Sequence, residues 1–144
     1  MPIRKAQYEG MDSLVIEIHG LTVRYDPKTA ASAFAIKEVG LRIGAGEVVG
    51  VLGESGSGKS TLAAAIMRLL PSTAECHGQI LFENRDLMAM GLDELQRIRG
   101  KYISLIPQDP ATSLNPVIRI GTQISEVLRA HLQLNHSERK KRVQ

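Results

Sequence analysis

A glycine-rich segment at residues 53–60 is the part of the sequence best suited to chemistry. It reads Gly-Glu-Ser-Gly-Ser-Gly-Lys-Ser and matches G-x-x-x-x-G-K-[ST], the pattern of a phosphate-binding loop. Glycines let successive backbone N–H groups turn inward around a phosphate. Lys59 offers a mobile positive charge for the β- and γ-phosphates, and the Ser60 hydroxyl is a suitable Mg²⁺ ligand. The predicted binding residues are Gly53, Glu54, Ser55, Gly56, Ser57, Gly58, Lys59, Ser60 and Thr61, the last on the α-phosphate side.

The segments on either side of this loop predict the elements that must hold it. Residues 48–52 form a continuous apolar run, which is typical of a strand buried on both faces of a parallel sheet. From Ser60 the apolar residues follow helical spacing, and Pro71 is expected to end the helix. The predicted apolar face of this helix consists of Leu62, Ile66, Leu69 and Leu70. A strand, a glycine turn and a helix in this order are the context that the motif requires.

The remaining pattern predicts an α/β chain. Short β-branched or apolar segments indicate strands at residues 14–18, 21–25, 34–43, 78–82 and 102–106, the last of them buried like 48–52. Helices are expected at 93–99 and 121–134, and Ser137 is placed to cap a further helix.

Composition excludes several functional classes. The 144 residues are 43% hydrophobic and 23% charged, which is typical of a globular protein. The net charge is only +3, and residues 139–142 are all basic, so the rest of the chain is nearly neutral and a nucleic-acid partner is not expected. Cys76 is the only cysteine, which excludes an intrachain disulfide. Residues 1–10 lack the apolar region of a secretory signal, and the apolar run 62–67 is far too short to span a bilayer.

Two separated motifs together resemble one family. Residues 46–61 are similar to the Walker A region of ATP-binding-cassette (ABC) ATPases. Residues 108–116, Gln-Asp-Pro-Ala-Thr-Ser-Leu-Asn-Pro, resemble the glutamine loop of the branch that contains the ATPase subunits of dipeptide, oligopeptide and nickel importers. Residues 121–126, Gly-Thr-Gln-Ile-Ser-Glu, are also similar to that branch. The resemblance runs from about Leu14 to the last residue.

The resemblance implies roles for further residues. It gives Gln108 a place at the Mg²⁺ and attacking-water side, so that the implied catalytic residues are Lys59 and Gln108 and the implied metal ligands are Ser60 and Gln108. It gives Tyr25 the role of stacking on adenine, although a lone tyrosine at a strand end is also compatible with simple packing. The implied cofactors are ATP and Mg²⁺.

The resemblance also implies a fold: a P-loop core of the ABC type, with an N-terminal antiparallel β-subdomain and the start of a helical subdomain. The expected parts are residues 12–52 for the β-subdomain and first core strand, 53–70 for the loop and helix, 71–116 for the core up to the glutamine loop, and 117–144 for the start of the helical subdomain. The family's Leu-Ser-Gly-Gly-Gln signature, its second acidic strand and its switch histidine do not occur in the sequence. We therefore expect a truncated cassette that is hydrolysis-incompetent and marginally stable by itself.

The function implied by the resemblance is that of an ATP-binding subunit of an importer for peptides or a similar small solute. Its implied partners are membrane-spanning permease subunits, a second ATPase subunit and, indirectly, a solute-binding protein. Its implied location is the cytoplasmic face of the inner or plasma membrane. The alternative is a truncated module that binds ATP–Mg²⁺ without hydrolysing it. A small P-loop kinase would need an acceptor site and a lid, for which the sequence gives no candidate.

Overall fold

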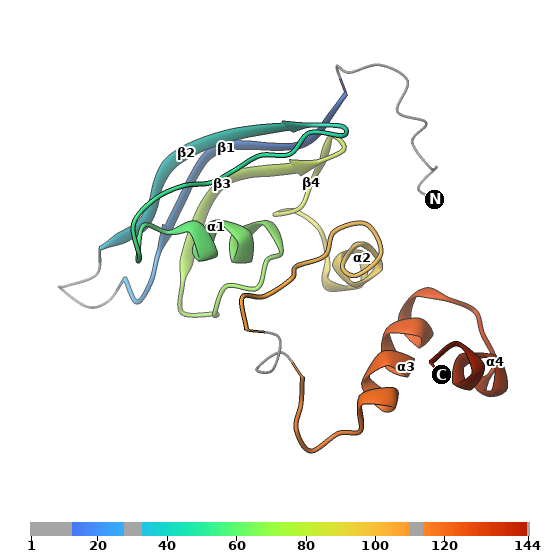
Figure 1. Cartoon of the computed structure of the whole chain (residues 1–144). Helices are drawn as coiled ribbons and strands as arrows, with labels where there is room; N and C mark the ends of the chain where they lie inside the picture. Colours follow the sequence, from blue (N-terminus) through green and yellow to red (C-terminus); the bar gives the residue numbers. More distant parts are fainter. Residues whose placement is uncertain (1–12, 28–32, 110–113, 144) are drawn as a thin grey trace. The chain divides into compact units, whose positions relative to one another are not determined.

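The computed structural model describes residues 13–27, 33–109 and 114–143 (Figure 1). The N-terminal segment considered above as a signal, and residues 110–113 of the glutamine-loop motif, lie outside these described residues. The chain divides into two compact units, Met1–Met90 and Gly91–Gln144. Each unit is described by itself below.

The first unit is built on an antiparallel sheet of four strands in the order β2-β1-β3-β4. The strands are β1 (Leu14–Arg24), β2 (Phe34–Gly44), β3 (Glu75–Phe82) and β4 (Arg85–Asp86). This antiparallel sheet agrees with the predicted strands at 34–43 and 78–82. The helix α1 (Lys59–Ile66) lies against the concave side of the sheet (Figure 1).

The central strand β1 joins two segments that were expected as separate strands. Its buried positions are Ile16 and Ile18 before the junction and Leu21 and Val23 after it, so the alternation shifts by one residue. The shift occurs at Gly20, which has a φ of 58° and coincides with an irregular register toward both neighbouring strands. A bulge of this kind keeps both pairs of apolar side chains on the face that forms the core.

Helix α1 is shorter than predicted. It ends at Ile66, whereas the sequence placed its end at Pro71. Arg68 takes a left-handed conformation with a φ of 49°, which cannot continue a right-handed helix. The Arg68 guanidinium donates hydrogen bonds to the carbonyl oxygens of Leu87 (3.0 Å) and Met90 (2.6 Å). This side chain therefore ties the end of α1 to the segment that follows β4.

The second unit contains the helices α2 (Leu92–Ile98), α3 (Ile120–His131) and α4 (His136–Val143). All three helices were predicted, but the cap of α4 was assigned to the wrong residue. The Asn135 side-chain oxygen accepts from the N–H of Glu138 (3.0 Å), and the Glu138 carboxylate accepts from the N–H of Asn135 (2.7 Å). This reciprocal pair is a capping box that begins at Asn135, not at Ser137.

Two apolar segments predicted as buried strands are extended without strand pairing in the described residues. Val48 and Leu52 are both 96% exposed, and Ile106 is 91% exposed. In the second segment, the isolated bridge from Ile103 to Arg99 is the only β pairing that the structure describes. The predictions of strands at 48–52 and 102–106 are therefore wrong. An apolar run is typical of a buried segment, but a strand also needs a neighbouring backbone with which to form hydrogen bonds.

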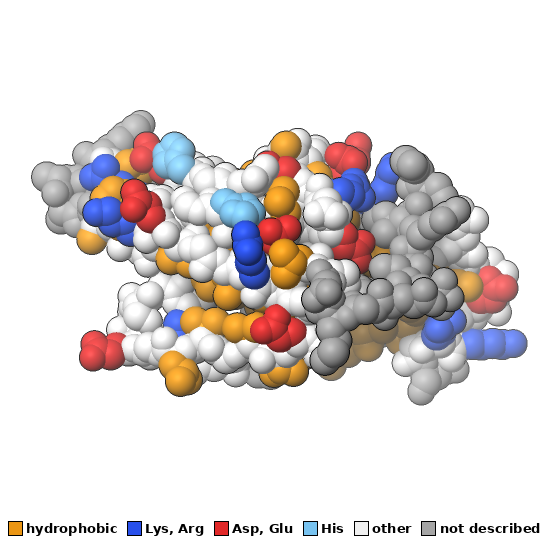
Figure 2. Space-filling view, turned by 90° about the horizontal axis from the view of Figure 1, so that it is seen from above, with side chains coloured by type: hydrophobic (Ala, Val, Ile, Leu, Met, Phe, Trp, Pro, Cys, Tyr) orange, Lys and Arg blue, Asp and Glu red, His pale blue; other side chains and the backbone are white. Residues whose placement is uncertain are grey.

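The face seen in Figure 2 carries interspersed acidic and basic side chains, with hydrophobic atoms showing between them. This distribution agrees with a chain that is nearly neutral outside residues 139–142. No helix in the described ranges is both long and apolar enough to cross a membrane.

Candidate nucleotide-phosphate site

The phosphate loop connects the extended segment 48–52 to α1, and its glycines are needed for different reasons. Gly56 and Gly58 have φ values of 81° and 91°, in the left-handed region that favours glycine. Gly58 also lies directly against β2, where an added Cβ would be 2.3 Å from the Ala35 carbonyl oxygen. At Gly53 an added Cβ would be 2.6 Å from the Ser57 hydroxyl oxygen. The loop therefore has its shape because no side chain is present at these three positions.

Helix α1 starts directly after the loop and leaves its N-terminus available to an anion. Gly58 is the N-cap and makes no side-chain capping hydrogen bond, and the first turn contains no acidic residue. The free N–H groups and the helix dipole both favour negative charge at this end. Ser60 lies exposed in this first turn, where its hydroxyl could reach a cation bound to a phosphate.

Lys59 is folded back over the loop. Its ammonium donates to the carbonyl oxygens of Gly53 (2.8 Å) and Glu54 (2.6 Å) and to the Ser57 hydroxyl (3.2 Å). These bonds hold a positive charge against the backbone of the loop. A phosphate oxygen bound here would compete with them for the ammonium and would gain a charge-assisted hydrogen bond.

Tyr25 lies close to the same helix. It follows the end of β1, is half-buried, and donates a hydrogen bond from its hydroxyl to the Thr61 hydroxyl at 3.3 Å. The structure thus brings together the predicted base-stacking residue and the predicted α-phosphate residue. Neither the stacking nor the phosphate contact is tested by this geometry, so both roles stay predictions.

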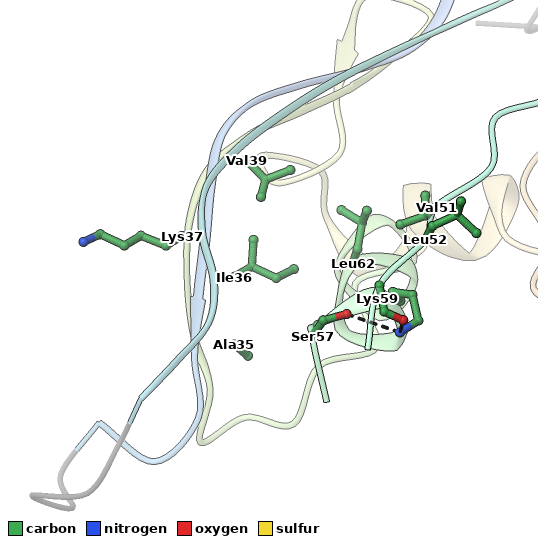
Figure 3. Close-up of a pocket in the computed structure, with 11 residues that line it drawn as sticks. Ala35, Ile36, Lys37, Val39, Val51, Leu52, Ser57, Lys59 and Leu62 are labelled. Carbon is green, nitrogen blue, oxygen red and sulfur yellow. Dashed lines mark hydrogen bonds between the residues drawn. The ribbon is translucent and has the colours of Figure 1, made fainter. Parts of the chain in front are cut away.

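A cavity of about 300 Å³ adjoins the loop (Figure 3). Ile36 and Val39 of β2 and Leu62 of α1 point toward it, and the ammonium of Lys59 bonded to Ser57 lies at its edge. Its other lining residues are Ala35, Lys37, Val51, Leu52, Gly53 and Gly58, of which Lys37 points away from the space. The contribution of β2 was not predicted, because the contact between Ala35 and Gly58 depends on how the sheet packs and leaves no local signal in the sequence.

Gln108 lies in the second unit, exposed in the irregular segment 104–109. Its contribution to a metal site stays a prediction. The other predicted site residues, Tyr25 and 53–61, all lie in the first unit. Backbone N–H donors, one ammonium and an adjacent hydroxyl form a set that fits a nucleotide phosphate with its Mg²⁺.

Cys76, on β3, is not a candidate nucleophile. Burial raises the pKa of its thiol, and the nearby Arg68 opposes this effect only in part. The thiol therefore stays protonated at neutral pH, which is the unreactive form.

The sequence of the chain matches a known family model over most of its length. The model describes the ABC transporter and matches residues 36–144, the segment that contains the phosphate loop, the glutamine segment and the helices α1 to α4. The chain belongs to the ABC transporter family. The resemblance drawn from the two motifs is therefore confirmed.

Within this family the relatives include ATP-binding proteins of peptide importers. The chain is 46% identical over 110 residues to the oligopeptide transport ATP-binding protein OppD of Bacillus subtilis, covering 75% of this chain and 31% of the relative. It is 41% identical over 104 residues to OppD of Escherichia coli, with 72% and 31% covered. The glutathione import ATP-binding protein GsiA of Salmonella choleraesuis is 37% identical over 132 residues, with 86% and 21% covered. The chain thus spans about a third or less of the length of these relatives.

A solved ABC structure has the same fold. The dimeric post-hydrolysis state of the ATP-binding cassette MJ0796, bound to ADP and Pi, matches with a TM-score of 0.70 and 27% sequence identity. The match covers 89% of this chain and 53% of that chain. The predicted fold class, an ABC-type P-loop α/β fold with an antiparallel β-subdomain, is confirmed.

Proposed function

We propose that this chain is part of the ATP-binding subunit of an ABC importer, which couples ATP binding and hydrolysis to the transport of peptides or a similar small solute. The observation that carries the proposal is the phosphate loop at the N-terminus of α1, with Lys59 held across it by three hydrogen bonds. The similarity to OppD and GsiA supports the class of solute.

The binding step follows from the chain's own residues. The loop N–H groups and the α1 N-terminus receive the β- and γ-phosphates, and Lys59 exchanges bonds to loop carbonyls for bonds to phosphate oxygens. Ser60 and Gln108 would hold Mg²⁺, which would neutralise part of the phosphate charge. Tyr25 stacks on the base, and its bond to Thr61 links the base side of the site to the phosphate side.

The partners follow from the same assignment. Membrane-spanning permease subunits and a second ATPase subunit complete the transporter, and a solute-binding protein delivers the solute to it. The chain is then located at the cytoplasmic face of the inner or plasma membrane, held there through the permease subunits.

The test is a calorimetric titration of the chain with ATP in the presence of Mg²⁺, followed by an assay for released phosphate. Saturable binding supports the proposal, and absence of binding contradicts it. The phosphate assay measures whether the isolated chain hydrolyses the ATP that it binds. The alternative function is a module that binds ATP–Mg²⁺ without hydrolysing it, and turnover by the chain would contradict that alternative. Our expectation for the isolated chain is binding without turnover, because the sequence offers no general base for the attacking water.

A further inference from the structure

The side chain of Tyr25, the residue directly after β1, is bonded to the first turn of α1. Its hydroxyl donates to the Thr61 hydroxyl at 3.3 Å, a contact between residues 36 positions apart in the chain. Both side chains are half-buried. The bond therefore joins the end of a sheet strand to the helix that follows the phosphate loop.

The place of Thr61 on α1 directs its hydroxyl toward this contact. Thr61 lies one helical turn before Ala65, which is 1% exposed, so both residues are on the packed side of α1. The neighbouring hydroxyl residue, Ser60, is exposed instead. A threonine hydroxyl has one donor hydrogen and two acceptor lone pairs. Accepting a bond from Tyr25 is therefore compatible with donating one to a phosphate oxygen.

The backbone end of Tyr25 is restrained as well. Arg24, the residue before it, pairs with Phe34 of β2 and with Glu75 of β3. The axis of a tyrosine ring runs from its Cβ to its hydroxyl oxygen, so restraint at both ends fixes the direction of this axis. The torsion that remains is χ2, which turns the faces of the ring about the axis without moving the ring away from α1.

We propose that Thr61 is a positioning residue for Tyr25: its hydroxyl holds the tyrosine ring beside α1, so that the ring is already in place when a nucleotide binds. The proposal rests on the proposed function, because a fixed ring affects binding only if Tyr25 stacks on the base. A side chain that is ordered beforehand loses less conformational entropy on binding, which raises the affinity for the whole nucleotide. Thr61 thus acts on the base through Tyr25, in addition to its predicted contact with the α-phosphate.

The first experiment needs no nucleotide and measures, by NMR of the full chain, the three-bond couplings that report χ1 of Tyr25. Thr61→Val keeps the shape of the side chain but loses the hydroxyl, whereas Thr61→Ser keeps the hydroxyl. Thr122, exposed in the first turn of α3, provides the matched control Thr122→Val. We expect a single χ1 rotamer in the wild type, Thr61→Ser and Thr122→Val, and averaged couplings in Thr61→Val. Averaging already in the wild type, or a single rotamer that persists in Thr61→Val, would overturn the proposal.

The second experiment compares the affinity for ATP with that for inorganic triphosphate, which has no base, by calorimetry with Mg²⁺ present. If Thr61 acts through Tyr25, the ratio of the two affinities falls about fivefold in Thr61→Val and in Tyr25→Phe, which keeps the ring, because each variant loses the same hydrogen bond. The double variant should lose no more than either single variant, and Thr61→Ser should recover the wild-type ratio.

Additive losses in the double variant, or a ratio that stays at the wild-type value because both affinities fall equally, would overturn the proposal. A wild-type chain that binds neither compound contradicts the proposed function instead. The χ1 couplings then still decide whether Thr61 holds Tyr25.

Discussion

The phosphate loop and the apolar run 48–52 are adjacent in the sequence, but they differ in what determines their structure. The loop has its shape from neighbours within a few residues: left-handed glycines, the Lys59 bonds to Gly53 and Glu54, and the start of α1. The run 48–52 has no such local determinants, and Val48 and Leu52 are almost fully exposed. Local interactions therefore shape the phosphate loop, whereas the burial that the apolar pattern predicts is not found at Val48 and Leu52.

The largest expected effect is the difference in stability between a variant in the buried core and a variant in the exposed run 48–52. Leu21 is fully buried in β1, and Leu21→Ala should lower the free energy of unfolding by about 2–5 kcal/mol. Leu52→Ala removes the same atoms from an exposed position and should cost less than about 0.5 kcal/mol. Urea denaturation of both variants measures the difference. Comparable losses in the two variants would show that 48–52 is buried in solution.

A second, smaller effect tests the packing of the loop on β2. Gly58→Ala combines a strained φ with a Cβ placed against the Ala35 carbonyl oxygen, so it should cost more than about 2 kcal/mol and weaken nucleotide binding. Gly56→Ala is the matched control, because its φ of 81° is similar but nothing lies within 4 Å of the added atom. It should cost about 1–2 kcal/mol in the same denaturation experiment. Equal costs would argue that the β2 contact is unimportant.

This contrast explains how much the sequence could predict. The strands β1 to β3, the glycine turn followed by a helix, and the helices α2 to α4 carry signals in residue type and spacing, and those predictions agree with the structure. Phosphate binding by residues 53–61 stays a prediction. The contact of Gly58 with Ala35 joins segments distant in the chain, and the end of α1 depends on Arg68 reaching Leu87 and Met90. Neither is visible in a local pattern. The strand predictions at 48–52 and 102–106 are wrong for the same reason. A strand is defined by its pairing with a neighbouring strand, and the apolar pattern does not identify that neighbour.

The smallest expected effect is the loss of stability of α4 when its N-cap residue is replaced. Asn135 and Glu138 bond to each other's backbone at the start of α4, so Asn135→Ala should destabilise that helix by about 1 kcal/mol. Ser137→Ala, at the position first expected to be the cap, should change helix content little. Carbon chemical shifts across α4 report on both variants. A larger loss of helicity with Ser137→Ala would restore the original prediction.

The most direct test of the account is the ATP affinity of Lys59→Ala beside that of Lys37→Ala, measured by calorimetry with Mg²⁺ present. The two variants lose the same charge, but Lys59 lies across the phosphate loop and Lys37 points away from the adjoining cavity (Figure 3). We predict that Lys59→Ala lowers the affinity by at least about tenfold, the equivalent of one lost charge-assisted hydrogen bond, and that Lys37→Ala changes it by less than about twofold. Unchanged affinity in Lys59→Ala would contradict the assignment of residues 53–60 as the nucleotide site.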